Sequence, residues 1–221
     1  MRLSHTFIGT AVRELKYGIH VLLLVLLTAS CSSIPPLDPT IGDTGQPQSD
    51  IALKTDVLQY TINIEVLPKS KSIQGSGSAT FYMLADSQSV ELKLDSRFDI
   101  ERVEVDEQVA TYTRQQGIIL IALGKTARIG DHVTATVYYS GKPHIALKAP
   151  WEGGFVWDKT ATGEDFIATA VQGEGCDLFW PCKDHFNDKA ERTFINLTVP
   201  KPLVAVTNGV LQQTIAVEGN K

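Results

Sequence analysis

The chain has 221 residues, of which 43% are hydrophobic and 20% are charged, and its formal net charge is −5 at pH 7. This composition suits a globular protein of one or two domains with a hydrophobic core. Because the net charge is negative and no basic patch occurs along the sequence, the composition argues against nucleic acid as a partner.

The first 30 residues predict an export signal. Three basic residues precede the apolar run at residues 21–30, which is well short of the ~20 residues that a membrane-spanning helix needs. The run ends in Leu27-Thr28-Ala29-Ser30-Cys31, which resembles the lipobox of bacterial lipoproteins, where the cysteine becomes the lipidated mature terminus. We therefore expect a signal peptide over residues 1–30 and lipidation at Cys31. Ordinary cleavage with release and an uncleaved anchor are the alternatives.

The residues after Cys31 indicate where the protein resides. Ser32 resembles the sorting signal for the outer membrane, so we expect a lipid anchor in the bacterial cell envelope, in the outer membrane and facing the periplasm. The lipid membrane is then one partner of the chain, through Cys31. Residues 31–52 are rich in Pro, Gly and Ser and lack apolar periodicity, which predicts a flexible tether.

From residue 53 onward the sequence predicts an all-β domain. Residues 57–66 alternate apolar and polar side chains, as on a half-buried strand. Gly75 and Gly77 predict a bulge or strong twist in the next strand, and Asn208-Gly209 is a strong hairpin signal. Such short strands, without helical periodicity, predict a mostly antiparallel sheet or sandwich over residues 53–221. The further predicted strands are residues 73–83, 89–94, 100–105, 110–114, 118–123, 132–139, 166–171, 194–200, 203–207 and 210–217.

The segment AVQGEGCDLFWPCKDH, residues 170–185, gathers several residues that bind metals or form disulfides. Cys176, Cys182 and His185, with Asp177 and Asp184 nearby, are possible metal ligands, but structural zinc sites space their paired cysteines more closely. In an exported protein the two cysteines are more prone to oxidation than to metal binding. We therefore expect no metal here and consider a Cys176–Cys182 disulfide, with two buried, unbonded cysteines as the alternative.

The other notable residue of this segment is an acid between two glycines. Glu174 follows a predicted strand, and flexible glycine backbone on both sides lets a carboxylate approach a ligand closely. This arrangement suits a charge-assisted contact with a cation such as an ammonium group. The alternative is a solvated acid in a turn.

The same segment contains a specific motif, Gln172-Gly173-Glu174, followed by Phe179-Trp180-Pro181-Cys182-Lys183-Asp184 and Lys189. This motif resembles one in the N-terminal domain of the aminopeptidase N family of zinc metallopeptidases, the gluzincins that include leukotriene hydrolases. It is similar to the family's Gln-x-Glu/Gln segment, its aromatic-Pro-Cys-x-Asp sequence and its downstream lysine. Other matching stretches bring the resemblance to about residues 55–213.

The resemblance implies a fold and a function. The family's first domain is a saddle-like, largely antiparallel β domain that packs on a thermolysin-like catalytic domain. One of its loops reaches the active site, so Glu174 would bind the free α-amino group of the substrate and Gln172 would line the same pocket. The implied activity is removal of N-terminal residues from peptides, with the peptide N-terminus as partner and zinc on the catalytic domain.

The chain itself lacks the residues for that hydrolysis. Zinc peptidases of this type need a His-Glu-x-x-His motif, which none of the five histidines begins, and the family's Gly-x-Met-Glu-Asn signature is also missing. We therefore expect a non-catalytic domain of a longer lipoprotein aminopeptidase that is inactive alone and binds no cofactor. The alternatives are a free-standing β-sheet binding module on a lipoprotein anchor and an unrelated envelope lipoprotein with a sandwich fold.

Overall fold

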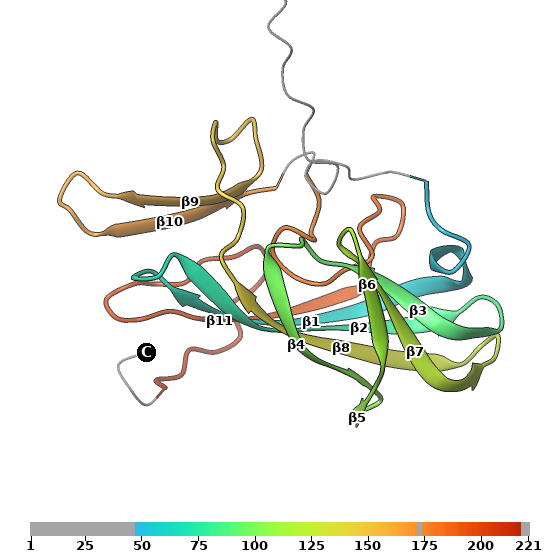
Figure 1. The fold of residues 1–221 in the computed structure, drawn as a ribbon. Helices are drawn as coiled ribbons and strands as arrows, with labels where there is room; N and C mark the ends of the chain where they lie inside the picture. Colours follow the sequence, from blue (N-terminus) through green and yellow to red (C-terminus); the bar gives the residue numbers. More distant parts are fainter. Residues whose placement is uncertain (1–46, 172–173, 218–221) are drawn as a thin grey trace, which may run out of the picture. The chain divides into compact units, whose positions relative to one another are not determined.

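The computed structural model describes residues 47–171 and 174–217, all within the structural unit Asp38–Lys221. The expected signal peptide, Cys31 and Gln172 lie outside the described residues. Within them there is no α-helix, only the short 3-10 helix η1 (Ala52–Lys54) and strands (Figure 1), so the predicted all-β fold is confirmed. No helix of this part is long and apolar enough to cross a membrane.

The largest sheet has six strands in the order β11-β1-β2-β8-β4-β5. Its neighbouring strands pair antiparallel, except that β11 pairs parallel with β1. Buried and more exposed residues alternate along β8, as a strand with one face on the core requires. The strands of this sheet are β1 (Thr55–Leu67), β2 (Ser72–Met83), β4 (Phe98–Val105), β5 (Gln108–Val109), β8 (His132–Gly141) and β11 (Arg192–Thr198).

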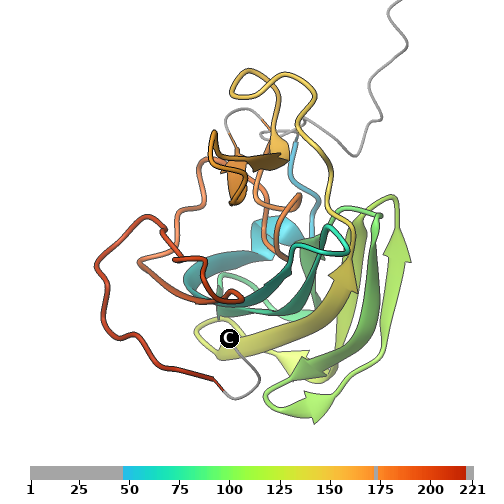
Figure 2. The same cartoon turned by 90° about the vertical axis from the view of Figure 1, so that its left-hand side faces the viewer.

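Two smaller sheets complete the fold. One has the order β3-β7-β6 and the other is the hairpin β9–β10, which Figures 1 and 2 show apart from the larger sheet. Buried side chains of the large sheet and of the three-stranded sheet belong to one hydrophobic core, which also takes in Phe155 of β9. The strands are β3 (Ser87–Lys93), β6 (Tyr112–Gln115), β7 (Ile118–Ala127), β9 (Gly154–Lys159) and β10 (Asp165–Ala170).

Three features differ from the sequence-based expectations. Residues 203–207 and 210–217 form no strands, and Asn208-Gly209 makes a bend without a hairpin. Most of their apolar side chains are exposed, and a hairpin with no face to bury is unstable. Strand β9 was missed by the sequence analysis. Residues 47–52, which the sequence assigned to the tether, contact the fold, since Ser49 donates a hydrogen bond to Glu91 of β3 at 2.7 Å.

Gly77 in β2 provides space instead of a bulge. The predicted bulge is wrong, because the register between β1 and β2 shifts only between Val57 and Gln59. Gly77 pairs with Ile62 and Val137, both buried, so its Cα faces the core. A Cβ atom there would lie 2.6 Å from Cγ of Pro181. The missing side chain therefore lets the segment around Pro181 pack directly on the sheet.

We predict that Gly77→Ala lowers the free energy of unfolding by about 1–3 kcal/mol, because the methyl group overpacks the contact with a rigid proline ring. Urea denaturation measures the change. Pro181→Ala removes the ring atoms that would clash, so Gly77→Ala should cost much less in that background. Equal costs in the two backgrounds would show that Pro181 is not the reason for the glycine.

Candidate functional site

The loop after β10 is held between the two larger sheets. Cys182 forms an antiparallel β-bridge with Lys93 at the end of β3. The backbone N–H of Lys93 donates to the carbonyl of Cys182 at 2.7 Å, and the N–H of Cys182 donates to the carbonyl of Lys93 at 3.0 Å. From the other sheet, the Tyr139 hydroxyl donates a 2.7 Å hydrogen bond to the carbonyl of Phe179. With Pro181 seated on Gly77, these contacts fix the segment that the sequence analysis singled out.

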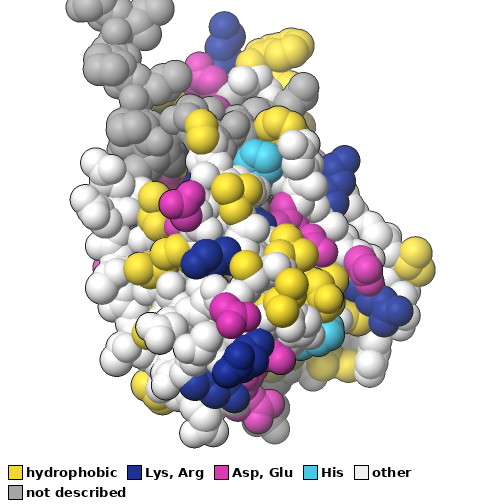
Figure 3. Space-filling view, turned by 90° about the vertical axis from the view of Figure 1, so that its right-hand side faces the viewer, with side chains coloured by type: hydrophobic (Ala, Val, Ile, Leu, Met, Phe, Trp, Pro, Cys, Tyr) yellow, Lys and Arg dark blue, Asp and Glu magenta, His cyan; other side chains and the backbone are white. Residues whose placement is uncertain are grey.

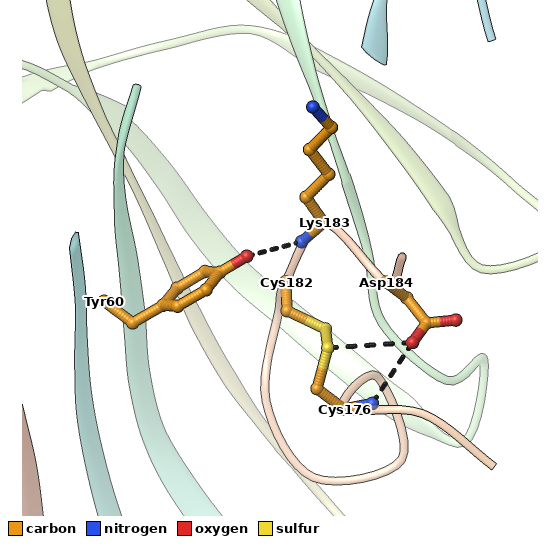
Figure 4. The surroundings of a disulfide bond; sticks show 5 residues. All are labelled: Tyr60, Cys176, Cys182, Lys183 and Asp184. Carbon is orange, nitrogen blue, oxygen red and sulfur yellow. Dashed lines mark hydrogen bonds between the residues drawn. A yellow bond between two sulfur atoms is a disulfide. The ribbon is translucent and has the colours of Figure 1, made fainter. Parts of the chain in front are cut away.

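A buried lysine attaches the same loop to β1. The backbone N–H of Lys183 donates to the Tyr60 hydroxyl at 3.0 Å, as Figure 4 shows. Burial raises the pKa of Tyr60, so this group stays a neutral phenol. The Lys183 ammonium donates to the carbonyl of Thr55 and forms an ion pair with Asp188. The Lys183 and Asp188 side chains are 6% and 7% exposed, so each compensates the charge of the other.

A disulfide joins Cys176 to Cys182 across this loop (Figure 4), which is the pairing that the sequence left open. The loop turns back between the two cysteines and brings their Cα atoms to 6.2 Å. Asp184 accepts a hydrogen bond from the backbone N–H of Cys176 at 3.3 Å, which closes the loop further.

The same residues do not fit a metal ion. Ligand atoms of Cys176, Cys182 and Asp184 lie within 4.8 Å of one another. Metals bind cysteine as the thiolate, however, and both sulfurs are committed to the disulfide. His185 belongs to no such cluster among the described residues and stacks on Phe186 instead.

Glu174 presents a carboxylate with one satisfied and one unsatisfied oxygen. The backbone N–H of Gly153 donates to Oε1 at 3.2 Å. Oε2 is shielded from solvent and receives no hydrogen bond from any described residue. A Cβ atom on Gly153 would lie 2.1 Å from Cγ of Glu174, so only glycine allows this contact. A carboxylate oxygen that is shielded from solvent and lacks a hydrogen-bond donor is a ready acceptor for a cation.

His144 is the other titratable group beside this carboxylate. Its pKa is lowered, first by burial and then by the charge of Arg97, against the opposing effect of Asp95, Glu174 and Glu152. The lowered pKa favours the neutral form of His144 at neutral pH. Neither Gly153 nor His144 was predicted as a site residue, because long-range contacts bring them near Glu174: β9 pairs with β10, and the backbone N–H of Phe155 donates to the carbonyl of His144.

Asp177, three residues after Glu174, is a second buried acid in the loop. Asp177 is 8% exposed to solvent. The pKa of its carboxyl group is raised to about 7, chiefly by burial and further by the charge of Asp184, while Lys93 lowers it. Asp177 therefore changes its protonation state near neutral pH.

Comparison with known proteins identifies the fold. The chain matches no protein-family model, and no curated protein matches it in sequence. A variant of a two-domain M1 zinc metallopeptidase bound to L-arginine is 21% identical with a TM-score of 0.65. The M1 zinc metallopeptidase from Deinococcus radiodurans is 20% identical, also with a TM-score of 0.65. Native yeast LTA4 hydrolase is 18% identical with a TM-score of 0.57.

These likenesses involve only part of the other proteins. The match covers 80% of this chain and 40% of each M1 metallopeptidase, and 79% of this chain and 28% of the yeast hydrolase. The chain thus has the fold of an N-terminal domain of the aminopeptidase N family, as its motifs indicated, and spans well under half of the length of these neighbours.

The raised pKa of Asp177 predicts a pH-dependent stability. Its folded-state pKa of about 7 lies above that of an unfolded aspartate, so its contribution is complete below about pH 4 and is lost as the pH rises through 7. Asp177→Asn should therefore be more stable than the wild type at pH 8, by on the order of 2–4 kcal/mol, with the difference vanishing towards pH 4.

Urea unfolding at pH 4.5, 6 and 8, values that span this titration, measures the effect. The matched control is Asp99→Asn, because Asp99 is an exposed aspartate. If Asp177→Asn shifted stability equally at all three pH values, Asp177 would not titrate near neutrality.

Proposed function

We propose that the chain is the substrate-binding N-terminal domain of a zinc aminopeptidase that removes N-terminal residues from peptides. In this proposal Glu174 binds the free α-ammonium group of the peptide. The observation that supports it most directly is that Oε2 of Glu174 is shielded from water and receives no hydrogen bond from any described residue. The fold likeness to M1 zinc metallopeptidases supports the class of enzyme.

The chemistry of an amino terminus suits this oxygen. An ammonium group carries three N–H donors and a positive charge. One of these donors can therefore give Oε2 the hydrogen bond that it lacks, and the positive charge strengthens that bond. The bond from Gly153 to Oε1 holds the carboxylate in one orientation beforehand, which reduces the entropy lost on binding. A solvated turn acid, the alternative, would have both oxygens open to water. Gln172 is proposed to line the same pocket.

Zinc belongs to the catalytic domain in this proposal. The chain contains no His-Glu-x-x-His motif, and its two closely spaced cysteines are oxidised. The described residues thus do not form the family's zinc site, and no step of hydrolysis is assigned to them. Their role is to bind and orient the amino terminus, and the chain alone is proposed to be inactive.

The cell envelope is the proposed location, with a lipid anchor at Cys31 in the outer membrane and the domain facing the periplasm. The Cys176–Cys182 disulfide supports an oxidising compartment, because cytosolic thiols are kept reduced. The lipobox-like sequence before Cys31 supports the anchor. Labelling cells with a radioactive fatty acid tests it, and unlabelled protein from wild-type cells would contradict it.

The role of Glu174 is testable in the polypeptide that carries this domain together with a catalytic domain. Glu174→Ala should lower kcat/KM for aminoacyl anilides about 10- to 150-fold, which corresponds to the ~1.5–3 kcal/mol of one hydrogen bond to a charged group. Glu101→Ala, at an exposed glutamate, is the control. An unchanged kcat/KM for Glu174→Ala would rule out the proposed contact.

Gly153→Ala tests whether the carboxylate is positioned by the backbone beneath it. The added methyl group would displace the Glu174 side chain, so we expect kcat/KM to fall at least about fivefold by loss of the same contact. In the Glu174→Ala background the second substitution should have little further effect. Additive losses would mean that Gly153 acts elsewhere.

A further inference from the structure

A cavity of about 290 Å³ lies on another side of the disulfide loop. Its walls come from the first described residues, strand β3, the turn before β7, and the loop segment from Asp177 to His185. Figure 3 views the molecule from the side on which β3 and β7 lie, where acidic, basic and apolar side chains are interspersed. The Glu174 carboxylate is not part of these walls.

Carboxylates dominate the charge of this cavity. Glu91, Asp177 and Asp184 line it, all less than one tenth exposed. Of the two lysines in the wall, Lys183 is committed to its ion pair with Asp188. Lys93 is therefore the lysine of the wall whose positive charge remains to balance the three acids. When all three acids are ionised, the cavity has an excess of negative charge.

Asp177 differs from the other two acids in the donors that its carboxylate receives. Glu91 accepts a hydrogen bond from Ser49, and Asp184 accepts one from the backbone of Cys176. The carboxylate of Asp177 receives a hydrogen bond from its own backbone N–H but none from a described side chain, and the residue is 8% exposed. A buried carboxylate without such a donor is costly when ionised, and a cation in the cavity would remove that cost.

Part of the wall is apolar. Ala52, Leu92 and Ile118 face the same cavity as the acids. Its volume lies at the lower end of ligand pockets, which measure about 300–1,000 Å³. A ligand that fits must therefore be small and combine a positive charge with a short hydrocarbon part.

A metal ion suits the cavity less well. Metal binding needs several oxygen atoms close enough to share one ion. Among the described residues, Glu91 and Asp177 take part in no group of acids and other ligands with that proximity. The separated acids suit a ligand whose hydrogen-bond donors and carbon atoms spread over the cavity.

We propose that this cavity binds a small primary alkylammonium, whose charged group contacts Asp177 and whose alkyl chain packs on Ala52, Leu92 and Ile118. This binding does not depend on the aminopeptidase function, because Glu174 takes no part in it.

The surroundings of Asp177 predict how binding depends on pH. Asp184 and Asp95 disfavour its ionised form and Lys93 favours it, while Glu91, Lys183 and His185 complete the charged and titratable groups of the wall. A bound cation favours the ionised carboxylate, so affinity should increase as Asp177 loses its proton. With a pKa of about 7, we expect affinity to rise roughly five- to tenfold between about pH 6 and pH 8.

Isothermal titration calorimetry with n-butylammonium chloride tests the proposal on the chain itself. We expect one site per chain, the stated rise with pH, and a loss of about tenfold or more in Asp177→Asn, which keeps the shape of the side chain and removes its charge. Asp99→Asn should bind as the wild type does. 1-Butanol, which has the same chain without the charge, should bind at least about tenfold more weakly.

Any one of four results would overturn the proposal. The first two are undetectable binding of n-butylammonium to the folded wild type and an affinity in Asp177→Asn equal to that of the wild type. The other two are an affinity for 1-butanol equal to that for n-butylammonium, and an affinity that does not change with pH. Displacement of n-butylammonium by an equal concentration of calcium chloride would assign the site to a metal ion instead. The pH series needs only the wild type, so a folding defect in a variant leaves the test intact.

Discussion

The disulfide loop depends on one buried cation, the Lys183 ammonium. Its ion pair with Asp188 and its bond to the Thr55 carbonyl offset a desolvation cost of several kcal/mol. Asp188 also accepts a hydrogen bond from the backbone of Val57, so the pair joins the loop to β1 and to the chain that leads into β11. Removing either partner would leave a buried charge without compensation.

This anchoring explains how a loop can present acids away from bulk water. Hydrogen bonds from Lys93 and Tyr139, the seat for Pro181 on Gly77, and the Cys176–Cys182 disulfide hold the backbone from several directions. The loop then has little freedom to turn its carboxylates outward. Oε2 of Glu174 therefore receives no hydrogen bond from any described residue, and Asp177 is held in a buried position without a donor side chain, so that each acid is suited to a cation.

Much of the fold was predictable from alternation of apolar and polar residues. β1, β2 and β8 follow this alternation over eight or more residues, and the structure places them as neighbours in one sheet. Local sequence failed where stability comes from distant contacts. Residues 203–217 have the alternation and the Asn208-Gly209 turn of a hairpin, yet they have no face to bury and form no strand. β9 forms because it pairs with β10, not because of its own pattern.

The candidate site was predictable only in part. Glu174 stood out because glycines flank it and because its surroundings resemble a family motif. The spacing of Cys176 and Cys182 did not decide between a bond and none, since the answer depends on how the loop turns. Gly153 lies 21 residues before Glu174 in the chain, so its hydrogen bond to the carboxylate could not be read from local sequence.

The central claim is that Glu174 Oε2 receives the α-ammonium group of a peptide. A crystal structure of the polypeptide that contains both this domain and its catalytic domain, with a bound amino acid, tests it most directly. The account predicts an N···O distance of about 2.7–3.2 Å between the ammonium nitrogen and Oε2, with the Gly153 bond to Oε1 retained. An amino acid whose ammonium group contacts other residues, with Glu174 turned away from it, would contradict the account.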